Sequence, residues 1–192
     1  MGGKLGKTNR SGDGDSDGDE ALVKRIGRGD AGAFKILMTR YASLHLSFAK
    51  RLVGSREEAE DIVQESYAKL WTHARNFDPR KSKFTTWFYR VVFNRCLDHK
   101  RKKRPLALPE DFDAPDDAPS AHHALEASER AARVREALER IPARQKAAIV
   151  LCYFEGVSNR EAAEILGLSV KALESLLGRG RQNLQVFLRS HV

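Results

Sequence analysis

SNREAAEILGLSVKALESLLGRGRQNLQVFLRSHV, residues 158–192, has the pattern of two helices joined by a tight turn. Ser158 followed by Glu161 is typical of a helix start with a capping box. Gly167 comes directly after the first helix, where glycine adopts the left-handed conformation at little cost. Ser169 can then cap a second, longer helix. The pattern predicts either a DNA-binding helix-turn-helix or an αα-hairpin within a bundle, because both use these caps and this turn.

The charge along the chain is uneven. The 192 residues carry a formal net charge of +8, and 41% of them are hydrophobic, which is enough for one large domain or two small ones. Residues 1–20 hold three basic and five acidic side chains, and residues 105–129 hold seven acids and no Lys or Arg. The remaining residues carry 31 basic and 14 acidic side chains. Such a basic body indicates a polyanionic partner, either nucleic acid or an anionic membrane surface.

Several classes of protein are disfavoured. No segment has the length and apolarity of a bilayer span, and no secretory signal is visible at the N-terminus. Cys96 and Cys152 each lie alone in apolar helical patterns, which indicates a reduced, cytoplasmic protein with two core thiols and no zinc site. The loop beginning at Asp13 matches the first half of an EF-hand, but its twelfth position is Lys24, so calcium is not expected. No catalytic constellation is found, and we predict neither an enzyme nor a cofactor.

Helical periodicity predicts an all-α fold of two small domains. The first domain is expected at residues 20–104 and the second at 125–192. Between them, residues 105–124 contain four of the six prolines and are expected to form a flexible acidic linker. Residues 1–19 are expected to be a disordered tail.

The first domain is predicted to contain four helices, at residues 20–26, 31–53, 56–73 and 87–104. Leu44 is expected in the buried stripe of the second helix and Trp71 in that of the third. Thr85 or Thr86 is expected to cap the last helix, after a polar loop at residues 76–83.

Basic and aromatic side chains alternate from Arg75 to Arg104, a segment with 11 basic and two acidic residues. This composition suits single-stranded nucleic acid, because cations bind phosphates and rings stack on bases. Trp87 and Phe88 also lie at helical spacing from the apolar residues that follow, so some of these rings are expected in the core. The preceding helix carries a polar patch, which by itself indicates only a solvated face.

Three motifs, in this order, resemble the extracytoplasmic-function (ECF) sigma factors, small subunits of bacterial RNA polymerase. AEDIVQESYAKLW at residues 59–71 is similar to the family's region 2.2. TWFYRVV at residues 86–92, with the basic run that follows, is similar to regions 2.3 and 2.4. The helix-turn-helix at residues 158–192 is similar to region 4.2.

The resemblance implies a site for each motif. Region 2.2 would bind the β′ clamp helices of core polymerase through Asp61, Gln64, Glu65, Leu70 and Trp71. Regions 2.3 and 2.4 would open and bind the −10 promoter element through Asn76, Phe77, Lys83, Phe84, Thr85, Thr86, Trp87, Tyr89, Arg90, Asn94 and Arg101. Region 4.2 would read the −35 element through Ser158, Arg160, Ser169, Lys171, Ala172, Glu174, Ser175, Arg179 and Arg181.

The resemblance also implies further partners. The second domain would contact the β flap of polymerase, and the linker would occupy polymerase channels used by template and RNA. An anti-sigma factor would silence the chain until a stress signal releases it, and no membrane insertion is expected.

The sequence departs from the family in the second helix of the helix-turn-helix. A position that is commonly basic is Glu174, which predicts an unusual −35 preference because a carboxylate can accept a hydrogen bond from cytosine N4. Gly178 and Gly180 would either let the backbone approach DNA closely or fray the helix.

Two other functions fit parts of the sequence. A free-standing helix-turn-helix regulator would bind duplex DNA alone and would leave the polar patch and the basic-aromatic segment without a role. A mimic that only occupies a sigma-binding partner would not need Lys171 or Arg179.

Overall fold

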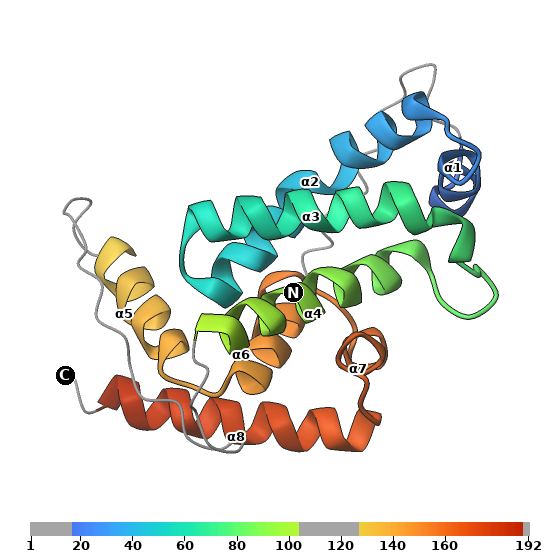
Figure 1. Ribbon diagram of the computed structural model, residues 1–192. Coiled ribbons are helices and arrows are strands. Elements are labelled where there is room, and N and C mark those ends of the chain that lie inside the picture. Colours follow the sequence, from blue (N-terminus) through green and yellow to red (C-terminus); the bar gives the residue numbers. More distant parts are fainter. Residues whose placement is uncertain (1–16, 104–126, 190–192) are drawn as a thin grey trace, which may run out of the picture.

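The computed structural model describes residues 17–103 and 127–189 (Figure 1). The first part contains α1 (Asp19–Ile26), α2 (Ala31–Val53), α3 (Arg56–His73), the short 3₁₀-helix η1 (Ala74–Asn76) and α4 (Phe84–Lys103). The second part contains α5 (Ala127–Glu139), α6 (Ala143–Ile149), the π-helix η2 (Val150–Phe154), α7 (Asn159–Leu166) and α8 (Val170–Arg189). These parts of the chain are all helical, as predicted. The expected linker and all but the end of the expected tail lie outside the described residues.

Local signals at the helix ends are confirmed. The predicted N-caps Ser158 (3.3 Å) and Ser169 (3.2 Å) each accept a hydrogen bond from the backbone N–H three residues on. Asp30 (3.0 Å) and Ser55 (3.3 Å) do the same at the starts of α2 and α3. Gly54 ends α2 with φ +87° and Gly167 ends α7 with φ +67°, the region that favours glycine. These contacts satisfy helix-end groups that would otherwise lack partners.

The predicted start of α4 is wrong. The helix begins at Phe84, and the N–H of Trp87 already donates to the carbonyl of Lys83 at 3.0 Å. Thr85 and Thr86 therefore lie in the first turn and do not cap the helix. The N–H of Phe84 donates to the Glu20 carboxylate at 3.3 Å, so a side chain of α1 supplies the partner that was expected from a threonine.

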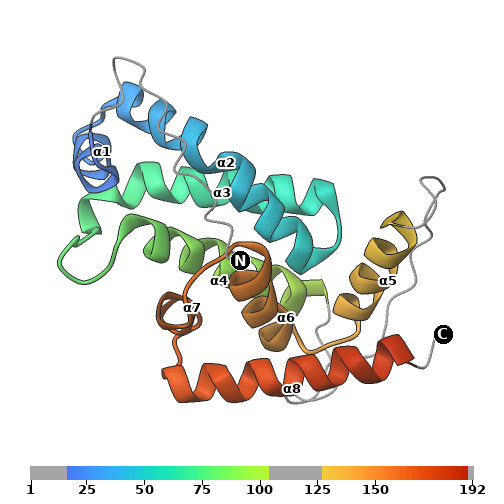
Figure 2. The same cartoon turned by 180° about the vertical axis from the view of Figure 1, so that it is seen from behind.

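The two domains pack against each other (Figures 1 and 2). Helices α2, α3 and α4 run side by side, and α1 crosses their end. Helix α7 packs on α4, while α8 extends along the outer side of the second domain. Buried side chains of both domains belong to one continuous hydrophobic core. The fold therefore brings the predicted helix-turn-helix against the basic-aromatic segment.

Two side chains that periodicity predicted in the core are exposed, and a third large apolar side chain is also at the surface. Leu44 is 45% exposed, and Trp71 is 41% exposed although its indole contacts Phe34 at a centroid distance of 5.4 Å. Tyr153 lies in η2, where the wider turn changes the helical register, and it is exposed. The buried stripes are thus narrower than the apolar pattern of the sequence.

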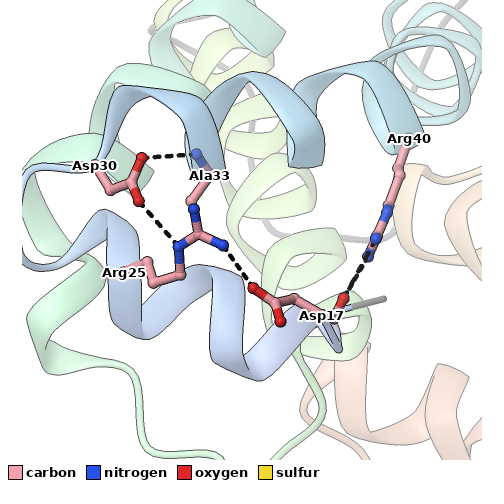
Figure 3. Close-up of polar contacts among 5 residues, drawn as sticks. All are labelled: Asp17, Arg25, Asp30, Ala33 and Arg40. Atoms are coloured by element: carbon pink, nitrogen blue, oxygen red, sulfur yellow. Dashed lines mark hydrogen bonds and ion pairs between the residues drawn. The ribbon is translucent and has the colours of Figure 1, made fainter. Parts of the chain in front are cut away.

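The N-terminal end of the described chain is held by two arginines (Figure 3). Arg25 bridges the carboxylates of Asp17, at 2.5 Å, and Asp30, at 2.9 Å. Arg40 donates to the Asp17 carbonyl at 3.2 Å and to the Asp19 carboxylate at 2.7 Å. Asp17, the last aspartate of the EF-hand-like segment, thus pairs with Arg25 through its carboxylate and with Arg40 through its backbone carbonyl.

The structure bears on the predicted cysteines and metal sites. Both thiols are free; Cys96 is buried, and burial raises its pKa to about 12, whereas Cys152 is half-buried. Among the described residues, no cluster of three His, Cys, Asp or Glu side chains is placed to hold a metal ion. Within the same residues, no helix combines the length and the apolarity required for crossing a membrane.

Candidate nucleic-acid interface

The residues predicted to read the −35 element share one property: every one is exposed. They are Ser158, Arg160, Ser169, Lys171, Ala172, Glu174, Ser175, Arg179 and Arg181. Helix α8 buries Leu173 and Leu177 on its opposite side, against the rest of its domain. An amphipathic helix with its polar side outward is what insertion into a major groove requires.

Glu174 lies in a polar hollow of about 220 Å³ at the junction of α7, α8 and η2. Asn159, Tyr153 and Arg181 line the same hollow, and Arg181 donates to the Tyr153 hydroxyl at 3.4 Å. The carboxylate that departs from the family pattern is therefore open to solvent beside a guanidinium group.

The two glycines of α8 have different roles, and neither expectation for Gly180 holds. Helix α8 is continuous from Val170 to Arg189, so it does not fray at the glycines. Gly180 is buried, and a Cβ there would lie 2.8 Å from Cδ1 of Ile149 on α6. Gly180 thus allows α8 to pack closely on α6, whereas a Cβ at Gly178 would meet nothing within 4 Å.

The residues predicted to bind the −10 element divide into two groups. The side chains at the surface are Asn76, Phe77, Lys83, Thr85, Trp87, Arg90, Asn94 and Arg101, of which Phe77, Thr85 and Trp87 are half-buried. The side chains of Phe84, Thr86 and Tyr89 are buried. A buried ring has no surface for DNA in this conformation, so the candidate interface consists of the first group.

The buried rings of α4 complete an aromatic core with α2 and α3. Phe84 and Phe88 stack at a centroid distance of 5.5 Å, and Phe88 lies 4.7 Å from the ring of His45. Nδ1 of His45 lies 3.0 Å from the Tyr67 hydroxyl. Burial lowers the pKa of His45 to about 3, so its imidazole is neutral at physiological pH. The core fixes the orientation of α4 and thereby of its exposed cations.

The predicted polymerase-binding patch on α3 is mostly accessible. Asp61, Gln64 and Glu65 are exposed on one side of the helix. Leu70 is 0% exposed and belongs to the core, whereas Trp71 offers part of its indole at the surface. The polar part of the patch and Trp71 are therefore available to a partner.

Helix α7 covers part of the α4 interface. Lys83 Nζ lies 2.9 Å from Glu161 Oε1, and Arg90 donates to the carbonyl of Glu164. The ion pair with Lys83 and the hydrogen bond from Ser158 lower the pKa of Glu161, which keeps it charged. The Glu161 carboxylate and the Glu164 carbonyl thus bind the two cations, Lys83 and Arg90, at which phosphates of a DNA strand would have to bind.

Glu155 joins the two domains at a second point. Its side chain is only 4% exposed and lies 3.1 Å from Arg51 Nη1 of α2. The Tyr89 hydroxyl donates to its other oxygen at 3.3 Å, and the Arg51 guanidinium lies 5.1 Å from the centroid of the Phe154 ring. Burial raises the pKa of Glu155, and Arg51 opposes this shift.

Sequence reasoning missed several of these residues. Lys69 and Arg95 border the α4 interface, and the helical spacing of four residues from Val91, which also lines it, would have placed Arg95 there. Glu155 and Glu161 have no such local signal, because their partners are 104 and 78 residues distant in sequence.

Residues 37–105 match the family Sigma-70 region 2, and residues 131–184 match Sigma-70, region 4. The ECF RNA polymerase sigma factor SigE of Mycolicibacterium smegmatis is 32% identical over 181 residues, which cover 92% of this chain and 66% of SigE. The RNA polymerase sigma factor CnrH of Cupriavidus metallidurans is 31% identical over 183 residues, covering 90% of this chain and 95% of CnrH. The chain belongs to the ECF sigma factors.

Two solved structures are similar to this sigma factor. CnrH in complex with the cytosolic domain of CnrY has a TM-score of 0.70 and 28% identity, covering 92% of this chain and 100% of that chain. RpoE of Bartonella quintana, in complex with the anti-sigma factor NepR, shares the fold with a TM-score of 0.61 and 24% identity, over 81% of this chain and 96% of that chain. A sigma factor directs transcription initiation with RNA polymerase and is not itself an enzyme.

Proposed function

We propose that the chain recognises promoters in three steps. The exposed side chains of Asp61, Gln64 and Glu65, with Trp71, bind core polymerase. The outer side of α8 reads the −35 element, and the exposed cations of α4 guide the melted −10 strand. The observation that carries this proposal is the exposure of every predicted −35 residue on a helix whose other side is buried.

The packed arrangement of the domains must open for this function. Elements about 25 base pairs apart are separated by about 85 Å in B-DNA at 3.4 Å per base pair. A compact chain of 192 residues has a radius of gyration of only about 16 Å, so α4 and α8 cannot lie that far apart in the packed arrangement. In the arrangement of Figure 1, α7 also occupies Lys83 and Arg90. We infer that the structure is a closed form and that polymerase and promoter bind an open one.

We propose that an anti-sigma factor holds the chain inactive. The support is the likeness to CnrH, which was solved with the cytosolic domain of CnrY. A partner that bridges α4 and α7 would stabilise the closed form by binding it preferentially. The control of this sigma factor by a stress signal is part of the same proposal. Titration of a candidate inhibitor should abolish the initiation measured below.

Run-off transcription tests the proposal. Core bacterial RNA polymerase is combined with the full chain and a library of promoter-like duplexes, and transcripts are mapped. Discrete start sites that require the chain are expected, and alignment of active templates would define both elements. Polymerase binding without initiation would favour a mimic, and no polymerase binding would favour a free-standing regulator.

Substitution of Arg179 tests the recognition helix. A lost base or phosphate contact is worth about 1–3 kcal/mol, so Arg179→Ala is expected to lower initiation about tenfold or more on promoters with an intact −35 element. Gln185→Ala, also exposed on α8 but near its end, is the matched control. An equal loss on templates with a scrambled −35 element would contradict DNA reading by α8.

A further inference from the structure

Helix α8 keeps its outer side accessible when the two domains pack together. Polar contacts between the domains are made by Glu155, directly after η2, and by Glu161 and Glu164 of α7. Helix α8 packs mainly on α5, α6 and α7 of its own domain, and it lies at the outer edge of the molecule in both views (Figures 1 and 2). These closing contacts therefore leave the predicted −35 residues of α8 at the surface.

The accessible side of α8 is basic. All five charged side chains of the helix are exposed, and they are Lys171, Glu174, Arg179, Arg181 and Arg189. Four of the five are cations, which suit the phosphates of duplex DNA. The 20 residues of α8 span about 30 Å, more than the roughly 12 Å width of a major groove. The helix is thus long enough to contact base edges and the flanking backbone together.

Closure also neutralises a carboxylate at the start of α7. Glu161 lies in the first turn of this helix, directly after the exposed residues Ser158, Asn159 and Arg160. The first helix of a helix-turn-helix crosses the DNA backbone, so an unpaired carboxylate at its start would repel a phosphate. In the closed chain, Lys83 Nζ lies 2.9 Å from Glu161 Oε1. This ion pair removes a charge that opposes duplex binding.

Closure therefore affects the two promoter sites differently. It covers Lys83 and Arg90, which the −10 strand would need, and leaves α8 accessible. We propose that the closed chain, without polymerase, binds duplex DNA of the −35 element through α8. The inference rests on the proposed reading of that element by α8, and adds that this reading requires neither polymerase nor an open chain. A complete promoter, with both elements, still requires the open form.

The binding of the closed chain to duplex DNA has a result different from initiation. A closed chain on a −35 element cannot guide a melted strand, because Lys83 and Arg90 are engaged with α7. It therefore occupies the element without starting transcription, and it competes there with other proteins that bind the same duplex.

Fluorescence anisotropy on the full chain without polymerase tests the inference. The probes are two labelled duplexes, one with the −35 element that run-off transcription defines and one with that element scrambled. The chain should bind the first about tenfold more tightly or better, because each correct base contact contributes a factor of about five or more. Both affinities should fall as salt is added, since phosphate contacts release counterions. Equal affinity for the two probes would overturn the inference.

Substitutions on α8 show whether this helix makes the contact. Arg179→Ala is expected to weaken binding of the free chain to the −35 duplex about tenfold. Gln185→Ala, exposed near the end of α8, is the matched control and should bind as the wild type does. Wild-type affinity in Arg179→Ala would place duplex binding elsewhere on the chain and contradict the inference.

A covalent link across the domain interface tests whether the closed form is the one that binds. Lys83→Cys and Glu161→Cys, in a Cys152→Ser background, place two thiols at the ion pair, and a short bis-maleimide joins them while Cys96 is buried. The linked chain should bind the −35 duplex within about twofold of the unlinked triple variant, whereas initiation with polymerase should fall about tenfold or more. Loss of duplex binding on linking would show that the chain must open to bind, against the inference.

The outcomes also separate this inference from the sigma function. If the holoenzyme initiates at promoters in a manner that depends on Arg179, but the free chain prefers neither duplex, the inference is wrong and the sigma function stands. A holoenzyme that initiates at no promoter would overturn the sigma function, and this inference with it.

Discussion

At the scale of single residues, His45 shows how the core constrains the first domain. Its ring lies among Phe88, Tyr67 and Tyr89 and is closed off from solvent. One ring nitrogen meets the Tyr67 hydroxyl, and the other has no hydrogen-bond partner among the described residues. A charged imidazole at this position would be costly, so the folded domain keeps His45 neutral.

The stability of the chain should therefore fall in mild acid. The pKa of His45 is about 3 in the folded chain and about 6.5 when unfolded, so between these values only the unfolded chain binds the proton. The contribution of neutral His45 to the free energy of unfolding is complete above pH 6.5. It is lost progressively as pH falls toward 3, and the loss is about 1.4 kcal/mol at pH 5.5. Urea unfolding at several pH values measures this slope.

Two variants isolate the contribution of His45 to that slope. His45→Leu should have a shallower loss of unfolding free energy between pH 6.5 and 5.5 than the wild type. His73→Gln removes an exposed histidine at the end of α3 and should keep the wild-type slope. Equal slopes in His45→Leu and the wild type would assign the acid sensitivity to other groups.

At the scale of elements, α8 combines an exposed side, which we propose reads DNA, with a tightly packed one. Gly180 lies where α8 meets Ile149 of α6, and the Asn183 side-chain amide donates to Oε1 of the Gln145 side chain at 2.9 Å on the same side. The Arg140 guanidinium lies 4.5 Å from the centroid of the Phe187 ring. These contacts fix α8 in its domain, so its outer side is presented as a rigid unit.

The two glycines of α8 provide a matched test of this packing. Gly178→Ala should stabilise the chain by up to about 1 kcal/mol, because alanine favours helices and the added methyl meets no atom. Gly180→Ala places a methyl 2.8 Å from Ile149 Cδ1 and should destabilise it by about 1–2 kcal/mol through overpacking. Urea denaturation compares the two, and equal effects would contradict the packing role of Gly180.

Local signals predicted most elements but not their tertiary environment. The capping side chains and Gly167 predicted the helix ends correctly, because the hydrogen-bond partners of a cap lie within four residues in sequence. The start of α4 was missed since it depends on Glu20, 64 residues away. For the candidate site, residue types and spacing identified the exposed side of α8. Periodicity alone could not show that Tyr89 is buried, because its burial depends on His45 and Phe48 of α2 and on Glu155 of the second domain.

At the scale of the whole molecule, the two domains are held in a closed arrangement by a shared hydrophobic core and by polar anchors around α4. Glu155 is held by Arg51 and Tyr89, and Glu161 is held by Lys83. A buried carboxylate is stable only while its partners remain in place. A substitution at Glu155 therefore changes the interface without changing any apolar side chain of the shared core.

Reversal of one charge should open the molecule. Glu155→Lys would place a cation against Arg51, and the radius of gyration should rise from the roughly 16 Å typical of a compact chain of this length by several ångströms. Small-angle X-ray scattering measures this change. Glu136→Lys, an exposed position on α5, makes the same charge change and should leave the radius unchanged.

The double variant Arg51→Glu with Glu155→Arg tests the pairing directly. Restored opposite charges should return the chain to the compact radius. An unchanged radius in Glu155→Lys would show that apolar packing between α4 and α7 holds the domains together without this anchor.

The order of the closing elements along the chain has a consequence for synthesis on the ribosome. The first domain is complete at Lys103, whereas α7, which covers α4, ends only at Leu166. At about 5–20 residues per second, the ribosome needs several seconds to add the intervening residues. The nascent first domain can fold within that interval with Lys83 and Arg90 still uncovered. A newly made chain thus has a period in which the α4 surface is open, before the second domain exists to close over it.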